Sequence, residues 1–202
     1  MEVTYLGMNC VRLTGRDIAA LCDPAEGIKQ GAEATLLSQE DIKVPEKAGM
    51  VIDGPGEYEI KGAMITGVPA RLHVDEEGDR GTIYSVMIDG INVAYLGNIA
   101  PELSNNQIEA LGQVDVLIIP VGGHGLTLDS VSASKIISQL EPKYVVPTHY
   151  DDGKTKYAAP QDKLEVFLKE IGSNPEPMAK LKVSSRDMPL ETTIAVLQRA
   201  GA

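Results

Sequence analysis

The chain has 202 residues, of which 43% are hydrophobic and 23% charged, and its formal net charge at pH 7 is −11. This length and composition are typical of one globular domain, and we expect a single domain over 1–202 made of two fused halves, approximately 1–98 and 99–202. The negative charge argues against binding to nucleic acid or to anionic membranes, because both are polyanions. No apolar run approaches the length of a membrane span, and MEVTYLG lacks the features of a signal peptide, so the predicted location is the cytoplasm.

The first half of the chain is predicted to form short strands separated by glycines. The clearest hairpin is TIYSVMIDGINVAYLG, in which Asp89 and Gly90 form a tight turn between two β-rich arms. Cys10 and Cys22 lie within predicted strands and are expected in the core. The other strands expected here are VTYLG, CVRLT, IAALCD, ATLLS, MVIDG, YEIKG and AMITGVP.

The second half alternates between strands and helices. SNNQIEALG has Ser104 three residues before Gln107, which is a capping-box pattern at the start of a helix. VDVLIIPVGG is typical of a strand buried on both faces, and KYVVPTHY, AKLKVSS and TTIAVLQ are the other strands expected. DKLEVFLKEIG is predicted as an amphipathic helix, and so is LDSVSASKIISQLEP, with Asp129 as its N-cap and a buried stripe of Val131, Ile136, Ile137 and Leu140. This order predicts an α/β or α+β layered domain.

Three polar loops follow predicted strands, and they place candidate site residues at strand ends. YLGNIAP carries Asn98, PVGGHGLTLD carries His124, and PTHYDDG carries His149. The third histidine, His73, opens the acidic loop HVDEEGDRG. Ligands bind beyond the carboxyl ends of strands in layered α/β folds, and imidazoles near carboxylates form zinc sites. A histidine at a strand end is, however, more often exposed or hydrogen-bonded than a ligand.

Several phrases, in order along nearly the whole chain, resemble those of metallo-β-lactamase-fold hydrolases of the compact branch that includes ascorbate-6-phosphate lactonase-like proteins. The resemblance implies a four-layer αβ/βα sandwich, in which two sheets pack face to face with helices outside and a metal site lies along one edge. The phrases are VTYLGMNCVRL, DP at positions 23 and 24, GPGEYEIKGAMITGVPA, GTIYSVMIDGINVAYLGN, VDVLIIPVGGHGLTLD and EPKYVVPTHY.

The same resemblance assigns positions to the metal site. It implies that His149 occupies the position of a late metal ligand and that Asn98 stands where the family has an aspartate bridging two metals. His73 matches a further ligand histidine, and His124 matches a GGH phrase beside the site. Met8 stands where many relatives have a histidine.

The chain also departs from the family pattern. The H-x-H-x-D-H motif that follows the strand corresponding to ATLLS is missing, and a neutral amide such as Asn98 is a poorer ligand for a divalent cation than a carboxylate. A catalytic zinc needs about three protein ligands, and only His73 and His149 remain as good ones. We therefore expect no metal cofactor. The residues that stand in the neighbourhood of the missing motif are Gln39, Glu40 and Asp41.

These observations predict a degenerate member of the superfamily, which keeps the fold as a module that binds an unidentified small molecule or protein or assembles as a homo-oligomer. The alternative is an active hydrolase of a small lactone or phosphorylated metabolite. That enzyme would hold zinc in a remodelled site around His73, Asn98 and His149.

Three further hypotheses remain open, and each has a simpler structural explanation as its alternative. A hard cation could bind oxygens of Glu40, Asp41, Asp151 and Asp152 beside His149, although a solvated acidic rim explains the same residues. Cys10 and His149 could form a nucleophile–base pair, although a cysteine at a strand start usually packs in the core. The sequence Gly122-Gly123 could form an anion-binding nest or a plain turn.

Overall fold

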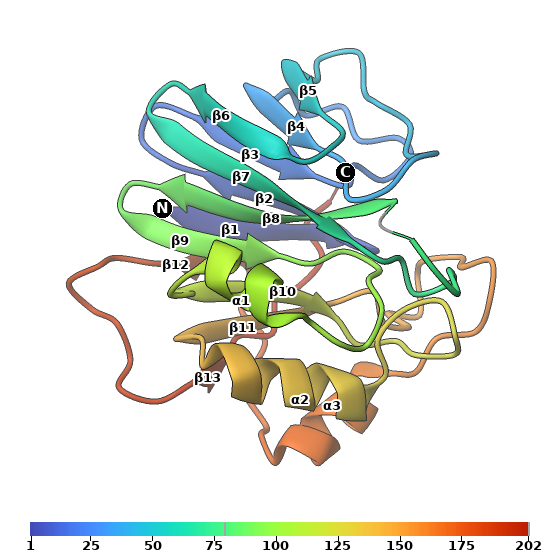
Figure 1. Cartoon of the computed structure of the whole chain (residues 1–202). Coiled ribbons are helices and arrows are strands. Elements are labelled where there is room, and N and C mark those ends of the chain that lie inside the picture. Colours follow the sequence, from blue (N-terminus) through green and yellow to red (C-terminus); the bar gives the residue numbers. More distant parts are fainter. Residues whose placement is uncertain (79, 202) are drawn as a thin grey trace.

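Two β-sheets stack face to face, and the helices lie on the side of the larger sheet (Figure 1). The computed structural model describes residues 1–78 and 80–201. One sheet has six strands in the order β12-β1-β2-β3-β4-β5, and the other has seven in the order β13-β11-β10-β9-β8-β7-β6. The predicted mixed α/β fold with two sheets is therefore confirmed.

The six-stranded sheet comes from the first quarter of the chain and one late strand. Neighbours β1, β2 and β3 are antiparallel, whereas β3, β4 and β5 are parallel. The sequence predicted a strand that ends at Ser38, but β4 ends earlier, at Leu36. The backbone N–H of Ser38 donates instead to the carboxylate of Asp23. The strands are β1 (Glu2–Gly7), β2 (Cys10–Thr14), β3 (Ala19–Cys22), β4 (Ala34–Leu36), β5 (Met50–Ile52) and β12 (Leu181–Lys182).

The seven-stranded sheet is antiparallel from β6 to β9 and parallel from β9 through β10 and β11 to β13. The predicted hairpin joins β8 and β9. Asp89 and Gly90 both have positive φ, at 53° and 76°, as a turn that follows the strand twist requires. The strands are β6 (Gly56–Ile60), β7 (Ala63–Ala70), β8 (Gly81–Ile88), β9 (Ile91–Tyr95), β10 (Val116–Pro120), β11 (Tyr144–Thr148) and β13 (Thr193–Ile194).

Three helices follow the hairpin, α1 (Asn105–Leu111), α2 (Ser130–Leu140) and α3 (Leu164–Ile171). Helix α1 packs on β7 and β8, and α2 packs on β10 and on α3. The predicted capping box at Ser104 and the N-cap at Asp129 are both confirmed. The prediction that Val131 is buried is wrong, because this side chain is 49% exposed and Ala133 takes its place on the buried face.

The main hydrophobic core is formed by buried side chains of both sheets and continues to the buried faces of α2 and α3. Strands β9 and β10 are buried along their whole length, which agrees with the continuous apolar run predicted for the second of them. The longest helix in the described residues has 11 residues, and no helix there is long and apolar enough to cross a bilayer.

Candidate functional site

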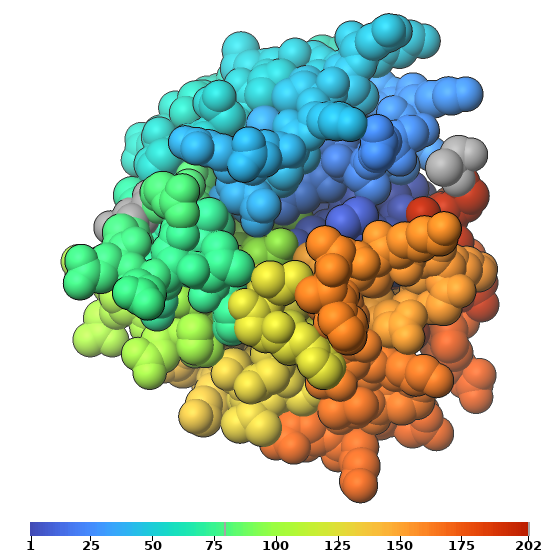
Figure 2. Space-filling view, turned by 90° about the vertical axis from the view of Figure 1, so that its right-hand side faces the viewer, coloured from blue at the N-terminus to red at the C-terminus, as the bar shows by residue number. Residues whose placement is uncertain are grey.

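Loops from both sheets meet along one edge of the sandwich, which faces the viewer in Figure 2. There the blue N-terminal segments lie above the yellow and orange segments of the second half. A small pocket of about 110 Å³ opens at this edge. Its lining brings together residues that are far apart in the chain, including Met8, Asn9, Asp23, Gln39, Asn98 and His149. Three predicted site residues, Gln39, Asn98 and His149, therefore lie in one pocket.

Amide side chains hydrogen-bond to one another across the pocket. Nδ2 of Asn9 donates to Oδ1 of Asn98 at 2.7 Å, and Nδ2 of Asn98 donates to Oε1 of Gln39 at 3.4 Å. The hydroxyl of Thr148 donates to Oδ1 of Asn9 at 3.1 Å. The amide oxygens of all three residues thus already accept hydrogen bonds from protein groups.

Asp23 lies at the end of β3 and is the buried carboxylate of the pocket. Its oxygens accept hydrogen bonds from the backbone N–H of Ser38 at 2.7 Å, from the Ser38 hydroxyl at 2.5 Å and from the Tyr95 hydroxyl at 2.6 Å. Burial raises the pKa of Asp23, and these hydrogen bonds oppose the rise. The carboxylate therefore joins the two sheets, since Tyr95 belongs to β9.

His149 follows β11 and is 7% exposed. Its ring stacks on Tyr157, with centroids 5.0 Å apart and planes 21° apart, and its Nδ1 has no hydrogen-bond partner in the described part of the chain. Burial lowers the pKa of the imidazole to about 4. The ring is therefore neutral at neutral pH.

The backbone around the pocket is strained at several residues. Met8, Asp23 and His149 all have positive φ, at 54°, 39° and 51°. Non-glycine residues rarely adopt this conformation, and such strain concentrates at functional sites. The N–H of His149 donates to the carbonyl oxygen of Met8 at 2.8 Å. This bond holds two of the strained residues side by side.

The other predicted site residues lie outside the pocket. His73 is adjacent, because its N–H donates to the carbonyl oxygen of Asn98 at 2.9 Å and its Nδ1 lies 3.3 Å from the carbonyl oxygen of Ile99. His124 pairs with Asp162, with Nε2 and Oδ1 3.1 Å apart. The structure does not bring Glu40 and Asp41 into the pocket, and both are exposed.

Sequence reasoning missed Asn9 and Asp23 as site residues. Asp23 lies in the DP phrase that carried part of the resemblance, so a signal for it was present. Asn9 has no such signal, since an asparagine between Met8 and Cys10 is unremarkable until Asn98 is placed 2.7 Å away.

The donor set fits a binuclear metal centre poorly. No group of three or more His, Cys, Asp or Glu side chains in residues 1–78 and 80–201 is arranged to hold a metal ion. The pocket offers one neutral imidazole, one carboxylate that already accepts three hydrogen bonds, and amides bonded to one another. Each zinc ion of such a centre requires about three protein ligands of nitrogen, sulfur or carboxylate type.

The hard-cation hypothesis fails on similar grounds. Oδ1 of Asp152 accepts the backbone N–H groups of Lys154 and Thr155, at 2.9 and 2.7 Å, and Oδ1 of Asp151 accepts the N–H of Gly153 at 2.9 Å. These carboxylates order their own loop. Within the described residues, they form no metal-binding group with Glu40 and Asp41.

The cysteine hypothesis is wrong as well. Cys10 is fully buried among Leu6, Leu21 and Ile28, and burial raises the pKa of its thiol to about 12. A protonated, inaccessible thiol is no nucleophile at neutral pH.

The two glycines after β10 are explained by packing and a turn. A Cβ on Gly122 would lie 2.1 Å from the carbonyl oxygen of His149, so only glycine fits at this position. The N–H of Gly123 donates to the carbonyl oxygen of Leu128 at 3.0 Å. It is therefore not free to bind an anion.

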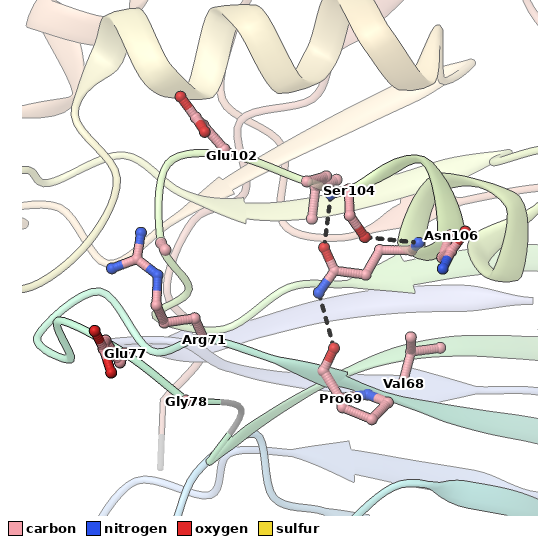
Figure 3. Close-up of a pocket in the computed structure, with 11 residues that line it drawn as sticks. Val68, Pro69, Arg71, Glu77, Gly78, Glu102, Ser104 and Asn106 are labelled. Carbon is pink, nitrogen blue, oxygen red and sulfur yellow. Dashed lines mark hydrogen bonds between the residues drawn. The ribbon is translucent and has the colours of Figure 1, made fainter.

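A cavity of about 820 Å³ lies away from this pocket, between the end of β7 and the start of α1 (Figure 3). Several of its polar groups serve the fold. Gln107 closes the capping box with Ser104, and its Nε2 donates to the carbonyl oxygen of Pro69 at 2.8 Å. Arg71 donates to the carbonyl oxygen of Asp75. We assign no ligand to this cavity.

The two packed sheets, with a polar pocket where the strand-end loops converge, define the metallo-β-lactamase fold. A crystal structure described as a Zn-dependent hydrolase of the metallo-beta-lactamase superfamily from Thermotoga maritima matches with a TM-score of 0.81 at 28% identity, covering 98% of each chain. A second crystal structure, from Parabacteroides distasonis, shares the fold at a TM-score of 0.63 and 17% identity, over 97% of this chain and 93% of that one.

Sequence comparison identifies the family. The family model described as "Beta-lactamase superfamily domain" matches residues 2–149. A protein of Pyrococcus horikoshii named UPF0173 metal-dependent hydrolase is 30% identical over 173 residues, which cover 80% of this chain and 70% of that protein. A relative of the same name from Thermococcus onnurineus is 30% identical over 60% of this chain and 54% of its own length. The chain belongs to this metal-dependent hydrolase family of the metallo-β-lactamase superfamily.

Proposed function

We propose that this chain is a member of its family that has lost the binuclear metal centre, together with the hydrolysis that depends on it, and that it acts as a binding or assembly module. The observation that carries the proposal is the chain of amides from Asn9 through Asn98 to Gln39. In this chain Asn98 stands where the family resemblance implies a bridging aspartate, and Gln39 lies in the neighbourhood of the missing metal motif.

The physical argument concerns charge. Metal-assisted hydrolysis requires a cation that lowers the pKa of bound water to about 7. A bridging carboxylate offsets the repulsion between two divalent cations, and the neutral amide of Asn98 does not. Binding a metal here would also break the bonds that the amide oxygens of Asn9, Gln39 and Asn98 accept. Neutral amide oxygens are weak ligands for a divalent cation, so the metal contacts would offset little of the free energy lost with these hydrogen bonds.

The direct test is the metal content of untagged protein after dialysis against zinc, measured by elemental analysis beside the variant His149→Ala. We expect far less than one metal per chain in both proteins, and a folded variant. A content near one per chain in the wild type that is lost in His149→Ala would contradict the proposal.

Asn98→Asp serves as a matched variant, because it restores the bridging carboxylate without changing the size of the side chain. We expect this single change to leave the protein without stoichiometric zinc, since Gln39 still stands at the missing motif. Stoichiometric zinc in Asn98→Asp alone would mean that most of the centre survives.

Two observations favour the second candidate, an active hydrolase of a small lactone or phosphorylated metabolite. The Nδ1 of buried His149 has no partner among the described residues, and the backbone of the pocket is strained; both are features that active sites retain. Hydrolysis of lactones and phosphoesters by the wild type and not by His149→Ala would support this enzyme. The absence of turnover, combined with a multimeric mass in light scattering, would support the assembly module.

A further inference from the structure

The four strands at the ends of the two sheets are not protected to the same extent. An edge strand presents unpaired backbone groups, and proteins prevent association there by shortening the strand or by placing charges on it. Strands β12 and β13 have only two residues each, and β6 carries the exposed Glu57 and Glu59. Strand β5, at the outer end of the six-stranded sheet (Figure 1), has neither a charged residue nor a proline within Met50–Ile52.

The backbone of β5 is paired with β4 on one side only. The N–H of Met50 donates to the carbonyl oxygen of Glu33, and the carbonyl oxygen of Ile52 accepts the N–H of Leu37, both at 2.9 Å. Successive peptide groups of a strand point to opposite sides, so the N–H and C=O of Val51 face away from β4. No strand within residues 1–78 and 80–201 pairs with β5 on that side.

The side chains at this edge are apolar and exposed. Met50 is 53% exposed and Val51 is 39% exposed, and Val44, in the segment before the strand, is 44% exposed. Single exposed apolar residues are ordinary on a protein surface. Two consecutive ones beside free backbone groups are the features of an edge that accepts another strand.

The charges around β5 are balanced, although the chain as a whole is strongly acidic. The segment 43–53 contains Lys43, Glu46, Lys47 and Asp53, so its formal charge is zero, while the whole chain carries −11. Both lysines precede the strand, and Asp53 follows it. An antiparallel second copy would bring Lys47 of each chain toward Asp53 of the other, so this order of charges is complementary to itself.

We propose that two copies of this chain pair through β5, antiparallel to each other about a two-fold axis at Val51. The N–H and C=O of Val51 then bond to the same groups of the second copy, and the two six-stranded sheets become continuous. Closed two-fold dimers are the commonest oligomers of soluble proteins. This inference specifies the assembly named in the proposed function and rests on that part of it, without involving the metal centre.

The test is sedimentation velocity at concentrations up to the millimolar range. We expect the wild type to convert from monomer to dimer with no larger species. Val51→Lys and Val51→Asp each place two like charges opposite one another at the axis, which destabilises a strand pair, so each variant alone should be monomeric. An equimolar mixture of the two variants should form dimers again, because each lysine then faces an aspartate.

Val131→Lys and Val131→Asp are the matched controls, because Val131 is 49% exposed and lies on α2, which packs on the other sheet. Both should dimerise as the wild type does. The inference is overturned by a monomeric wild type, by dimers in both Val51 variants, or by a mixture that stays monomeric. The lost metal centre is tested separately. One zinc per chain would contradict that loss and leave the dimer standing, and a monomeric wild type has no bearing on the metal content.

Discussion

Gly97 precedes Asn98 and shows how closely the backbone approaches the pocket. Its φ is +61°, and a Cβ here would lie 2.3 Å from Oγ and 2.5 Å from Cβ of Ser38. Since Ser38 holds the carboxylate of Asp23, Gly97→Ala would displace a buried network as well as strain the backbone. We expect it to lower the free energy of unfolding by roughly 3 kcal/mol, measured by urea denaturation.

Gly90→Ala separates the effect of backbone strain from that of the contact with Ser38. Gly90 also has a positive φ, +76°, but a Cβ on it would meet no atom of residues 1–78 and 80–201 within 4 Å. The backbone strain alone should cost about 1 kcal/mol. Equal losses for the two alanine variants would show that contact with Ser38 does not matter.

The buried imidazole of His149 makes stability depend on pH. Its pKa falls from about 6.5 in the unfolded chain to about 4 in the folded one, so between these values the unfolded state binds a proton that the folded state does not. Stability should therefore fall as pH decreases from about 6.5 to 4, by roughly 3 kcal/mol in total for this residue. Denaturant midpoints measured across this range in the presence of a chelator give the slope.

Other groups titrate in the same range, so the difference between proteins is the informative quantity. His149→Asn removes the titrating group and keeps a residue that tolerates positive φ. The variant should show a shallower loss of stability below pH 6.5 than the wild type. Parallel curves would mean that His149 is protonated without difficulty in the folded state.

At the level of elements, the three helices differ in how they begin. Asp129 accepts the N–H of Ser132 at 2.7 Å, and Asp129→Ala should cost about 1 kcal/mol. Lys163→Asp should do the opposite for α3 and stabilise the protein by about 0.5–1 kcal/mol. Thermal denaturation at low ionic strength measures the change in stability of each variant. A stability loss in Lys163→Asp would mean that the lysine makes a contribution which a cap cannot replace.

The elements with local signals were predictable from the sequence. The capping box at Ser104, the N-cap at Asp129 and the Asp89-Gly90 turn each depend on neighbours within a few residues, and all were found. Strand β4 ends early because Ser38 turns toward Asp23, fifteen positions away in the chain. Val131 is exposed because the stripe that α2 buries is set by β10 and α3, which helical periodicity does not reveal.

At the scale of the whole molecule, buried hydroxyls join the two sheets. Tyr84 of β8 donates to the carbonyl oxygen of Leu37, beyond β4, at 2.7 Å. Tyr84→Phe would leave that buried carbonyl without this donor and should cost about 1–3 kcal/mol. Tyr58→Phe is the control, because its hydroxyl lies at 3.4 Å from the carbonyl oxygen of Pro55 in an exposed setting. Equal, small effects would show that the Tyr84 hydroxyl contributes little to holding the sheets together.

The site was only partly predictable from the sequence, because its residues are brought together by the packing of the whole molecule. Family resemblance located Asn98 and His149, and the missing motif located Gln39. Whether such residues face one another depends on packing between sheets, and Asn9 and Asn98 meet across 89 positions of sequence. Single-residue propensity contains no information on such a pairing, and the resemblance itself placed no partner at position 9.

Both cysteines of the chain, Cys10 and Cys22, are buried and unpaired, and burial raises the pKa of each thiol. The native protein should therefore be nearly inert toward maleimides, so a single cysteine introduced on the surface becomes the one attachment point for a fluorophore or a spin label. Such a label could be attached at a chosen surface position without any need to remove the native thiols from the core.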